Sequence, residues 1–333
     1  MRSIFPGSLA LILGFSAMNT ASAAPEKMRA VEIRQSGALT VETRPVPRPG
    51  AGEVLIKVRA AGVNPVDWKS ARRRVGLVAG TDVSGTIDTL GEGVTGWKVG
   101  DPVLGFARQS GSYAEYAVVP VSALGRKPKS LTFEEAAGIP IAAETAYRSL
   151  HEAAKIARGQ TVLIHGAAGG VGTAAVQIAK AAGARVIGTA LPDNHDFLRA
   201  LGADQVIDYR GQRFEDVVKN VDIVLNTVNP EANARSIAIV RPGGVLVSII
   251  GPPDAVACEA AKIRCARPDR ETGASIAELL ARVAELADAG KLKVPVQKTF
   301  AMADAGKAWE ISRTGHARGK LIIKISDGAA KPR

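Results

Sequence analysis

Cysteine and histidine are scarce in this 333-residue chain, which has two cysteines and four histidines. Cys258 and Cys265 cannot form a tetrahedral zinc site by themselves. If both lay in one helix, a rise of 1.5 Å per residue would put their Cα atoms ~10 Å apart, too far for a disulfide. We therefore expect inert thiols, with pairing left open if the protein is exported.

Aromatic residues are also few, at 4% of the chain, whereas glycine occurs 35 times. Tight packing of backbone against backbone is therefore expected in place of large aromatic clusters. The net charge is +11, yet the only dense basic run is Arg72–Arg74, and no aromatics are interleaved with it. This pattern favours a solvated loop over a nucleic-acid surface, and an anionic small ligand would account for part of the positive field.

No apolar run reaches the ~20 residues of a comfortable membrane span. Residues 1–23 have one Arg, an apolar core from Leu9 to Phe15 and the small residues Ala21-Ser22-Ala23. This layout is typical of a secretory signal, so we expect export to the periplasm or the exterior. The alternative is a start at Met28 and a cytoplasmic protein.

The length and the ordinary balance of 46% hydrophobic and 23% charged residues indicate a globular protein of about two domains. Short Val- and Ile-rich runs separated by glycine-rich turns predict antiparallel strands in a barrel or sandwich at 29–33, 39–46, 53–63, 84–91 and 101–107. Residues 131–156 then read as helical. Continuous apolar strands alternate with helices from 161 to 251, which predicts a parallel sheet covered on both faces. Further helices are expected at 232–244 and 276–292.

A turn with almost no side chains follows the strand "TVLI" and opens a helix. It reads Ala167-x-Gly169-x-x-Gly172, the dinucleotide fingerprint with Ala in the first glycine position. Small residues make the turn tight, let a pyrophosphate approach the backbone and let the helix pack on its strand. Further strand–helix units follow in order, so the motif predicts a dinucleotide site and not a bare structural turn.

The stretch "GQTVLIHGAAGGVGTAAVQIAK" resembles the signature of quinone oxidoreductases and zeta-crystallin, in the medium-chain dehydrogenase/reductase superfamily. The resemblance implies an α/β fold, with a GroES-like β-barrel domain (28–147 and 293–327) and a Rossmann doubly wound parallel-sheet domain (148–292). It also implies a homodimer. Similar stretches run in the same order from Met28 to Ile325: "AAGVNPVDWK", "AGTDVSGTI", "GVTGWKVGDPV", "GSYAEYAVV", "LGADQVIDY", "RPGGVLVSI" and "GHARGKLIIKI".

Zinc alcohol dehydrogenases of this superfamily carry a Cys where this chain has Asn64, and a His-Glu pair where it has Thr81-Asp82. The resemblance therefore implies the zinc-independent branch, with no bound metal. Alcohol oxidation needs a Lewis acid. Hydride transfer from a nicotinamide to a quinone or an α,β-unsaturated carbonyl needs only hydrogen bonds to the oxygen that becomes negative.

Candidate catalytic residues follow from the resemblance. Asn64 could instead only shape the turn before Pro65, and Asp67 could only cap or pair with a neighbouring base. Tyr116 is as compatible with the core as with the cleft. The expected catalytic residues are Asn64, Asp67, Lys69, Tyr113 and Thr145.

The cofactor is expected to be NADPH, with NADH possible. An acidic residue that binds the ribose of NAD is absent at the end of the second strand, where Ala190 stands. Asp193 argues the other way, since a carboxylate beside a phosphate is unfavourable. The expected dinucleotide contacts are Ala167, Ala168, Gly169, Gly170, Val171, Gly172, Thr189, Ala190, His195, Tyr209 and Ile250.

The leading hypothesis is thus an NADPH-dependent quinone or alkene reductase. A second hypothesis is a nucleotide-binding sensor or structural relative without turnover, because free NADPH is scarce outside the cytoplasm. The third is an enoyl-thioester reductase. We expect no nucleic-acid partner.

Overall fold

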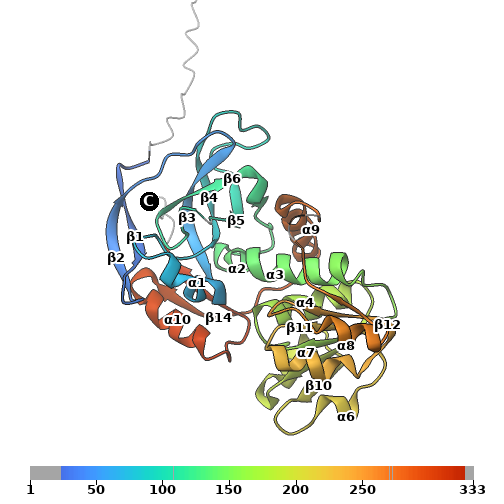
Figure 1. Cartoon of the computed structure of the whole chain (residues 1–333). Helices are drawn as coiled ribbons and strands as arrows, with labels where there is room; N and C mark the ends of the chain where they lie inside the picture. Colours follow the sequence, from blue (N-terminus) through green and yellow to red (C-terminus); the bar gives the residue numbers. More distant parts are fainter. Residues whose placement is uncertain (1–23, 108, 270, 272, 327–333) are drawn as a thin grey trace, which may run out of the picture.

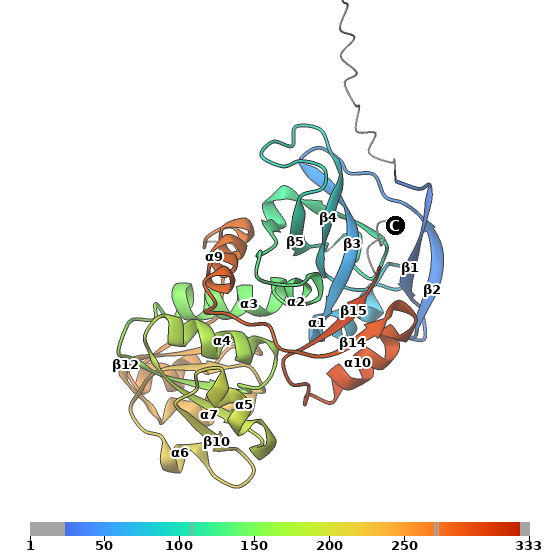
Figure 2. The ribbon, with the colours of Figure 1, turned by 180° about the vertical axis from the view of Figure 1, so that it is seen from behind.

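The computed structural model describes residues 24–107, 109–269, 271 and 273–326, so the predicted signal lies outside the described residues. The chain forms two lobes (Figures 1 and 2): one built on antiparallel strands and one on a parallel sheet, with α2 and α3 along their boundary. The predicted fold class, a GroES-like β lobe with a Rossmann-like lobe, is confirmed.

The β lobe contains a two-stranded sheet and a seven-stranded sheet in the order β14-β15-β3-β4-β5-β7, with β6 paired to β3. β15 comes from the end of the chain and runs antiparallel to β3, which puts Leu321 opposite Val63. The sequence patterns correctly predicted β1 to β5, and the apolar run that closes the chain predicted β15, but they missed β6, β7 and β14. The strands are β1 (Lys27–Ile33), β2 (Leu39–Pro45), β3 (Glu53–Val63), β4 (Asp82–Leu90), β5 (Pro102–Phe106), β6 (Tyr116–Pro120), β7 (Leu124–Arg126), β14 (Val296–Ala301) and β15 (Lys320–Lys324).

The second lobe is a six-stranded parallel sheet in the order β10-β9-β8-β11-β12-β13. The chain moves outward from β8 and then crosses to β11, so β8 and β11 flank the topological switch point, where such sheets bind ligands. The strands are β8 (Thr161–His165), β9 (Arg185–Ala190), β10 (Gln205–Asp208), β11 (Val221–Asn226), β12 (Val240–Ser248) and β13 (Arg264–Ala266). The helices between them are α4 (Gly170–Ala181), α5 (His195–Ala200), α6 (Phe214–Val217), α7 (Pro230–Ile237) and α8 (Ala255–Ala260).

The predicted helix over 131–156 is broken. Thr132 and Glu135 form the expected capping box of the first piece. The helix then stops at Gly138, and Pro140 starts a new one, since proline has no N–H to continue the ladder. The pieces are α2 (Phe133–Ala137), α3 (Pro140–Tyr147) and a π-helical segment, η3 (Arg148–Ala153).

The helices outside the parallel-sheet region are α1 (Pro65–Lys69), α9 (Ile276–Asp288) and α10 (Ala305–Arg313). The short 3₁₀ turns are η1 (Ala71–Arg73), η2 (Val121–Ala123), η4 (Pro192–Asn194) and η5 (Met302–Asp304).

Two further expectations are wrong. The helix predicted over 232–244 ends at Ile237, and the sheet strand β12 already starts at Val240. Cys258 and Cys265 are joined in a disulfide with Cα atoms 6.1 Å apart. They do not share a helix, because α8 ends at Ala260 and Lys262 turns the chain at φ 56° into β13.

Candidate active site

The fingerprint turn joins β8 to α4 at the switch point. Gly166 has φ +68°, a conformation that side chains rarely adopt. A Cβ on Gly172 would lie 2.2 Å from the Gly166 oxygen, so the helix can approach the strand only with glycine there. The first-turn amides of Gly170, Val171 and Gly172 have no intrahelical acceptor and lie at the positive end of α4. This turn can hold a pyrophosphate.

The chain segment that enters β15 of the β lobe contacts this turn. The Gly319 amide donates to the Ala168 carbonyl at 2.8 Å, and Gly319 and Gly169 form an isolated parallel bridge. A Cβ on Gly170 would lie 3.0 Å from Cδ of Lys320. The dinucleotide turn is therefore adjacent to the first residue of β15.

The predicted active-site loop starts where β3 ends. Asp67 of α1 is buried, and its two oxygens accept from three donors: the backbone N–H of Asn64 at 2.8 Å, Thr81 Oγ1 at 3.1 Å and the Tyr113 hydroxyl at 3.2 Å. Trp309 Nε1 of α10 donates in turn to the Tyr113 hydroxyl at 3.4 Å. The structure thus brings together three of the predicted residues: Asn64, Asp67 and Tyr113.

Two residues that sequence reasoning did not select complete this cluster. Asp82, at the start of β4, accepts from Nδ2 of Asn64 at 2.9 Å, and Lys320 donates to Oδ1 of Asn64 at 2.6 Å. Lys320 also donates to the carbonyl of Val63 at 3.0 Å and lies 3.7 Å from Asp82. The available signal was a charged residue directly before an apolar strand residue in each of two segments: Asp82 in "AGTDVSG" and Lys320 in "GKLIIKI".

Burial governs the charges of this cluster. It raises the pKa of Asp67 to about 6 and that of Asp82 to about 7, against the opposing attraction of Lys320. The same burial lowers the pKa of Lys320, while the two carboxylates oppose that shift. Burial raises the pKa of Tyr113 well above its usual range, so its hydroxyl stays a donor.

The other two predicted catalytic residues, Lys69 and Thr145, are carried by α1 and α3. Lys69 is exposed, with its Nζ 5.4 Å from the centroid of the Trp68 ring. Thr145 is buried on α3. Tyr116 belongs to β6 and is buried, which favours the core for this residue.

The predicted dinucleotide contacts divide by burial. Thr189 and Ala190 are buried at the end of β9, where Thr189 Oγ1 lies 3.3 Å from both the Gly166 amide and His165 Nδ1. Thr189 therefore supports the turn. Tyr209 and Ile250 are exposed to 46% and 36%, at the carboxyl ends of β10 and β12. Ala167 is buried and Ala168 and Val171 are half-buried.

His195 starts α5 beside the end of β9. Its Nε2 is a buried atom without a hydrogen-bond partner among the described residues. A polar atom in that state is a candidate to bind a ligand group.

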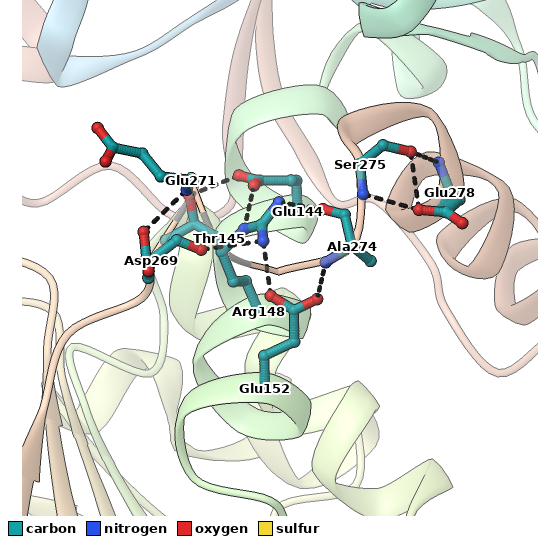
Figure 3. A network of polar contacts seen from close by, with 9 residues as sticks. All are labelled: Glu144, Thr145, Arg148, Glu152, Asp269, Glu271, Ala274, Ser275 and Glu278. Carbon is teal, nitrogen blue, oxygen red and sulfur yellow. Dashed lines mark hydrogen bonds and ion pairs between the residues drawn. The ribbon is translucent and has the colours of Figure 1, made fainter.

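A second polar network lies at the far end of α3 (Figure 3). The buried guanidinium of Arg148 donates to Glu144 at 2.8 Å and to Glu152 at 2.6 Å. It also donates to the carbonyls of Asp269 at 2.9 Å and Ala274 at 3.0 Å. Arg148 therefore holds the chain that leaves β13 against α3, the helix that carries Thr145.

Two family models match the chain: "Alcohol dehydrogenase GroES-like domain" over residues 50–129 and "Zinc-binding dehydrogenase" over 201–323. The chloroplastic quinone oxidoreductase QR1 of Triphysaria versicolor is 32% identical, with 84% of this chain and 92% of that protein covered. The chain belongs to the quinone oxidoreductase family of medium-chain dehydrogenases and reductases.

A solved structure and a further relative are similar to the chain over most of its length. The structure of the quinone oxidoreductase from Coxiella burnetii superposes with a TM-score of 0.82 at 32% identity, covering 90% of this chain and all of that one. The chloroplastic NADPH-dependent alkenal/one oxidoreductase of Arabidopsis thaliana is 31% identical over 84% of this chain and 73% of its own length. The chain is thus a nicotinamide-dinucleotide-dependent oxidoreductase.

The residues of this family member do not fit the zinc ion named by one family model. Asn64 uses its amide on Asp82 and Lys320, and both cysteines are in the disulfide. Across residues 24–326, apart from 108, 270 and 272, no three or more His, Cys, Asp and Glu side chains are grouped closely enough to hold a metal ion. No helix in that same part of the chain is both long and apolar enough to span a membrane.

Proposed function

We propose that this protein transfers a hydride from NADPH to a quinone or an α,β-unsaturated carbonyl. The observation that carries the proposal is the contact between the fingerprint turn and the loop of Asn64, made through Gly319 and Lys320. A dinucleotide held on the turn would have its reactive end beside a polar, hydrogen-bonded loop. The names of the quinone and alkenal/one oxidoreductase relatives support the acceptor class.

The amides of Gly170, Val171 and Gly172 are proposed to bind the pyrophosphate. Ala190 offers no carboxylate to the adenosine ribose, so it leaves room for a 2′-phosphate. His195 and the exposed Tyr209 would contact that phosphate, with the carboxylate of Asp193 opposing it. Two observations together favour NADPH: Ala190 has no carboxylate, and Nε2 of His195 has no hydrogen-bond partner within the described part of the chain.

Bound NADPH supplies the hydride, and one proton from solvent completes the reduction of a quinone to a hydroquinone. The chain contributes orientation and hydrogen bonds to the acceptor oxygen. Asn64 donates one Nδ2 hydrogen to Asp82, and the second is proposed to point at the acceptor. Lys69 and Thr145 are proposed to line the same site. Asp67 and Tyr113 are both buried. We propose that Asp67 fixes the Asn64 turn by accepting its backbone N–H, and that Tyr113 fixes Asp67.

The disulfide supports export, since disulfides persist mainly in oxidising compartments. We propose that the first 23 residues are a signal peptide and that the mature protein starts at Ala24 or Pro25. N-terminal sequencing of the mature protein tests this: an intact Met1 or a start at Met28 contradicts it. We also propose a homodimer, which light scattering would detect as twice the mass of one mature chain.

An acceptor panel tests the proposed reaction. NADPH or NADH is mixed with 1,2-naphthoquinone, 9,10-phenanthrenequinone, a small enone or a crotonyl thioester, and absorbance is followed at 340 nm. We expect turnover of quinone or enone, faster with NADPH. Turnover of only the thioester would favour an enoyl-thioester reductase. Tight NADPH binding without any turnover would favour a sensor.

A further inference from the structure

Lys320 is a buried cation with no role so far assigned in the proposed hydride transfer. It is 4% exposed and begins β15. Its backbone follows Gly319, which donates to Ala168 of the fingerprint turn. Its Cδ lies against Gly170, at the start of α4. The residue before Lys320 and the aliphatic stem of Lys320 therefore both contact the dinucleotide turn.

The ammonium of Lys320 lies at the Asn64 loop of the β lobe. It donates to the carbonyl of Val63 and to Oδ1 of Asn64, and it lies 3.7 Å from Asp82. Asp82 also accepts the amide of Ile141, at the start of α3, at 3.2 Å. One residue thus joins the fingerprint turn, the end of β3, the start of β4 and, through Asp82, helix α3.

Lys320 and Asp82 together dictate how the Asn64 amide is oriented. An ammonium can only donate, and the carboxylate of Asp82 accepts from Nδ2 of Asn64 and from the backbone amide of Ile141. With Lys320 at one side and Asp82 at the other, only one orientation of the amide satisfies both, with Oδ1 toward Lys320 and Nδ2 toward Asp82. The titratable groups that face Asp82 are Lys320, Asp67 and Tyr113.

We propose that Lys320 is a positioning residue that orients the Asn64 amide and keeps it in register with the dinucleotide turn for hydride transfer. The inference rests on the proposed function. Lys320 acts through Asn64, because its ammonium is enclosed by the loop and has the contacts described. Without the ammonium, the Asn64 amide loses the donor at Oδ1 and can rotate.

The first test compares Lys320→Met with Lys298→Met, an exposed lysine on the neighbouring strand β14. The NADPH Kd is measured by fluorescence titration and the hydride-transfer rate in a single turnover with 1,2-naphthoquinone. For Lys320→Met we expect a 10- to 100-fold slower transfer with a Kd within threefold of wild type. Lys298→Met should match wild type in both.

The second test separates orientation from stability. Lys320→Met leaves Asp82 without its cation, whereas Lys320→Met/Asp82→Asn removes both partners of that ion pair and should fold even if the single variant does not. We expect the double variant to recover thermal stability but not the transfer rate, because an asparagine at 82 can both donate and accept and no longer fixes the amide. Hydrogen–deuterium exchange of the dinucleotide-free double variant should rise selectively in peptides covering residues 61–70.

Each alternative outcome is distinguishable. If wild-type protein transfers no hydride to any acceptor, the proposed function fails first, and the exchange experiment alone decides the structural part of the inference. Unchanged transfer in Lys320→Met overturns the positioning role. So does a rise in Kd equal to the loss of rate, which would make Lys320 a dinucleotide ligand. Full recovery of rate in the double variant, or a uniform increase in exchange, would reduce Lys320 to a structural residue.

Discussion

The amide of Gly319 donates a hydrogen bond to the carbonyl of Ala168 at 2.8 Å and so joins the last turn of the β lobe to the dinucleotide turn. The two residues are far apart in the chain, yet their contact sets where the dinucleotide turn lies relative to β15, whose first residue bonds to Asn64. Gly319 has φ +68°, and a Cβ there would lie 2.2 Å from the Pro295 oxygen.

Replacing Gly319 with alanine should therefore destabilise the protein by about 2–4 kcal/mol, from backbone strain and overpacking together. It should also weaken NADPH binding. Gly315→Ala is the matched control, because Gly315 has φ +71° but open space around its Cβ position; its cost should be about 1 kcal/mol. Equal losses of unfolding free energy in the two variants, measured by urea denaturation, would show that the Pro295 contact does not matter.

The Arg148 network predicts a strongly unfavourable single substitution. Arg148→Met leaves Glu144, which is fully buried, without its cation. Breaking such a pair from one side should cost about 3–5 kcal/mol of unfolding free energy. Arg148→Met/Glu144→Gln should recover part of that loss. Arg199→Met is the control, because Arg199 and its partner Asp196 are exposed to 55% and 98%; a cost below about 1 kcal/mol is expected there. Similar losses at positions 148 and 199 would contradict this account of the network.

The disulfide predicts redox-dependent stability. The bridge closes a short loop with a sequence separation of seven, for which loop-closure entropy gives about 2–3 kcal/mol. Reduction with dithiothreitol should lower Tm by several degrees. The Cys258→Ser/Cys265→Ser variant should start from the lower Tm and be insensitive to the reductant. A wild-type Tm that reductant leaves unchanged, with free thiols detected, would contradict the prediction.

The raised pKa of Asp82 predicts a pH-dependent difference between wild type and Asp82→Asn. The folded carboxyl, with a pKa of about 7, binds its proton more tightly than the unfolded one near 3.8. Its contribution therefore favours folding at low pH and is lost as pH rises from about 4 to 7. The stability of Asp82→Asn relative to wild type should increase over that range. Tm measurements at pH 5, 6, 7 and 8 check this, and a constant or decreasing difference would be inconsistent with it.

The local sequence was sufficient for the fingerprint turn, because Gly166 and Gly172 are required by backbone geometry within a few residues. It was also sufficient for the parallel sheet, which follows from the alternation of apolar strands and helices. The contact between Lys320 and Asn64 could not be predicted, since 256 residues separate them and their approach depends on the register of β15 against β3. The disulfide was missed for a local reason, since the turn at Lys262 has no proline or glycine signal.

The most direct test of the central claim is a single turnover under anaerobic conditions. Stoichiometric NADPH, unlabelled or deuterated at the transferred position, is bound to the protein and mixed with 1,2-naphthoquinone, and absorbance is followed at 340 nm. The account predicts loss of one NADPH per quinone reduced, with slower transfer from the deuterated cofactor. Saturable NADPH binding with no absorbance loss for this or any other acceptor of the panel would contradict it.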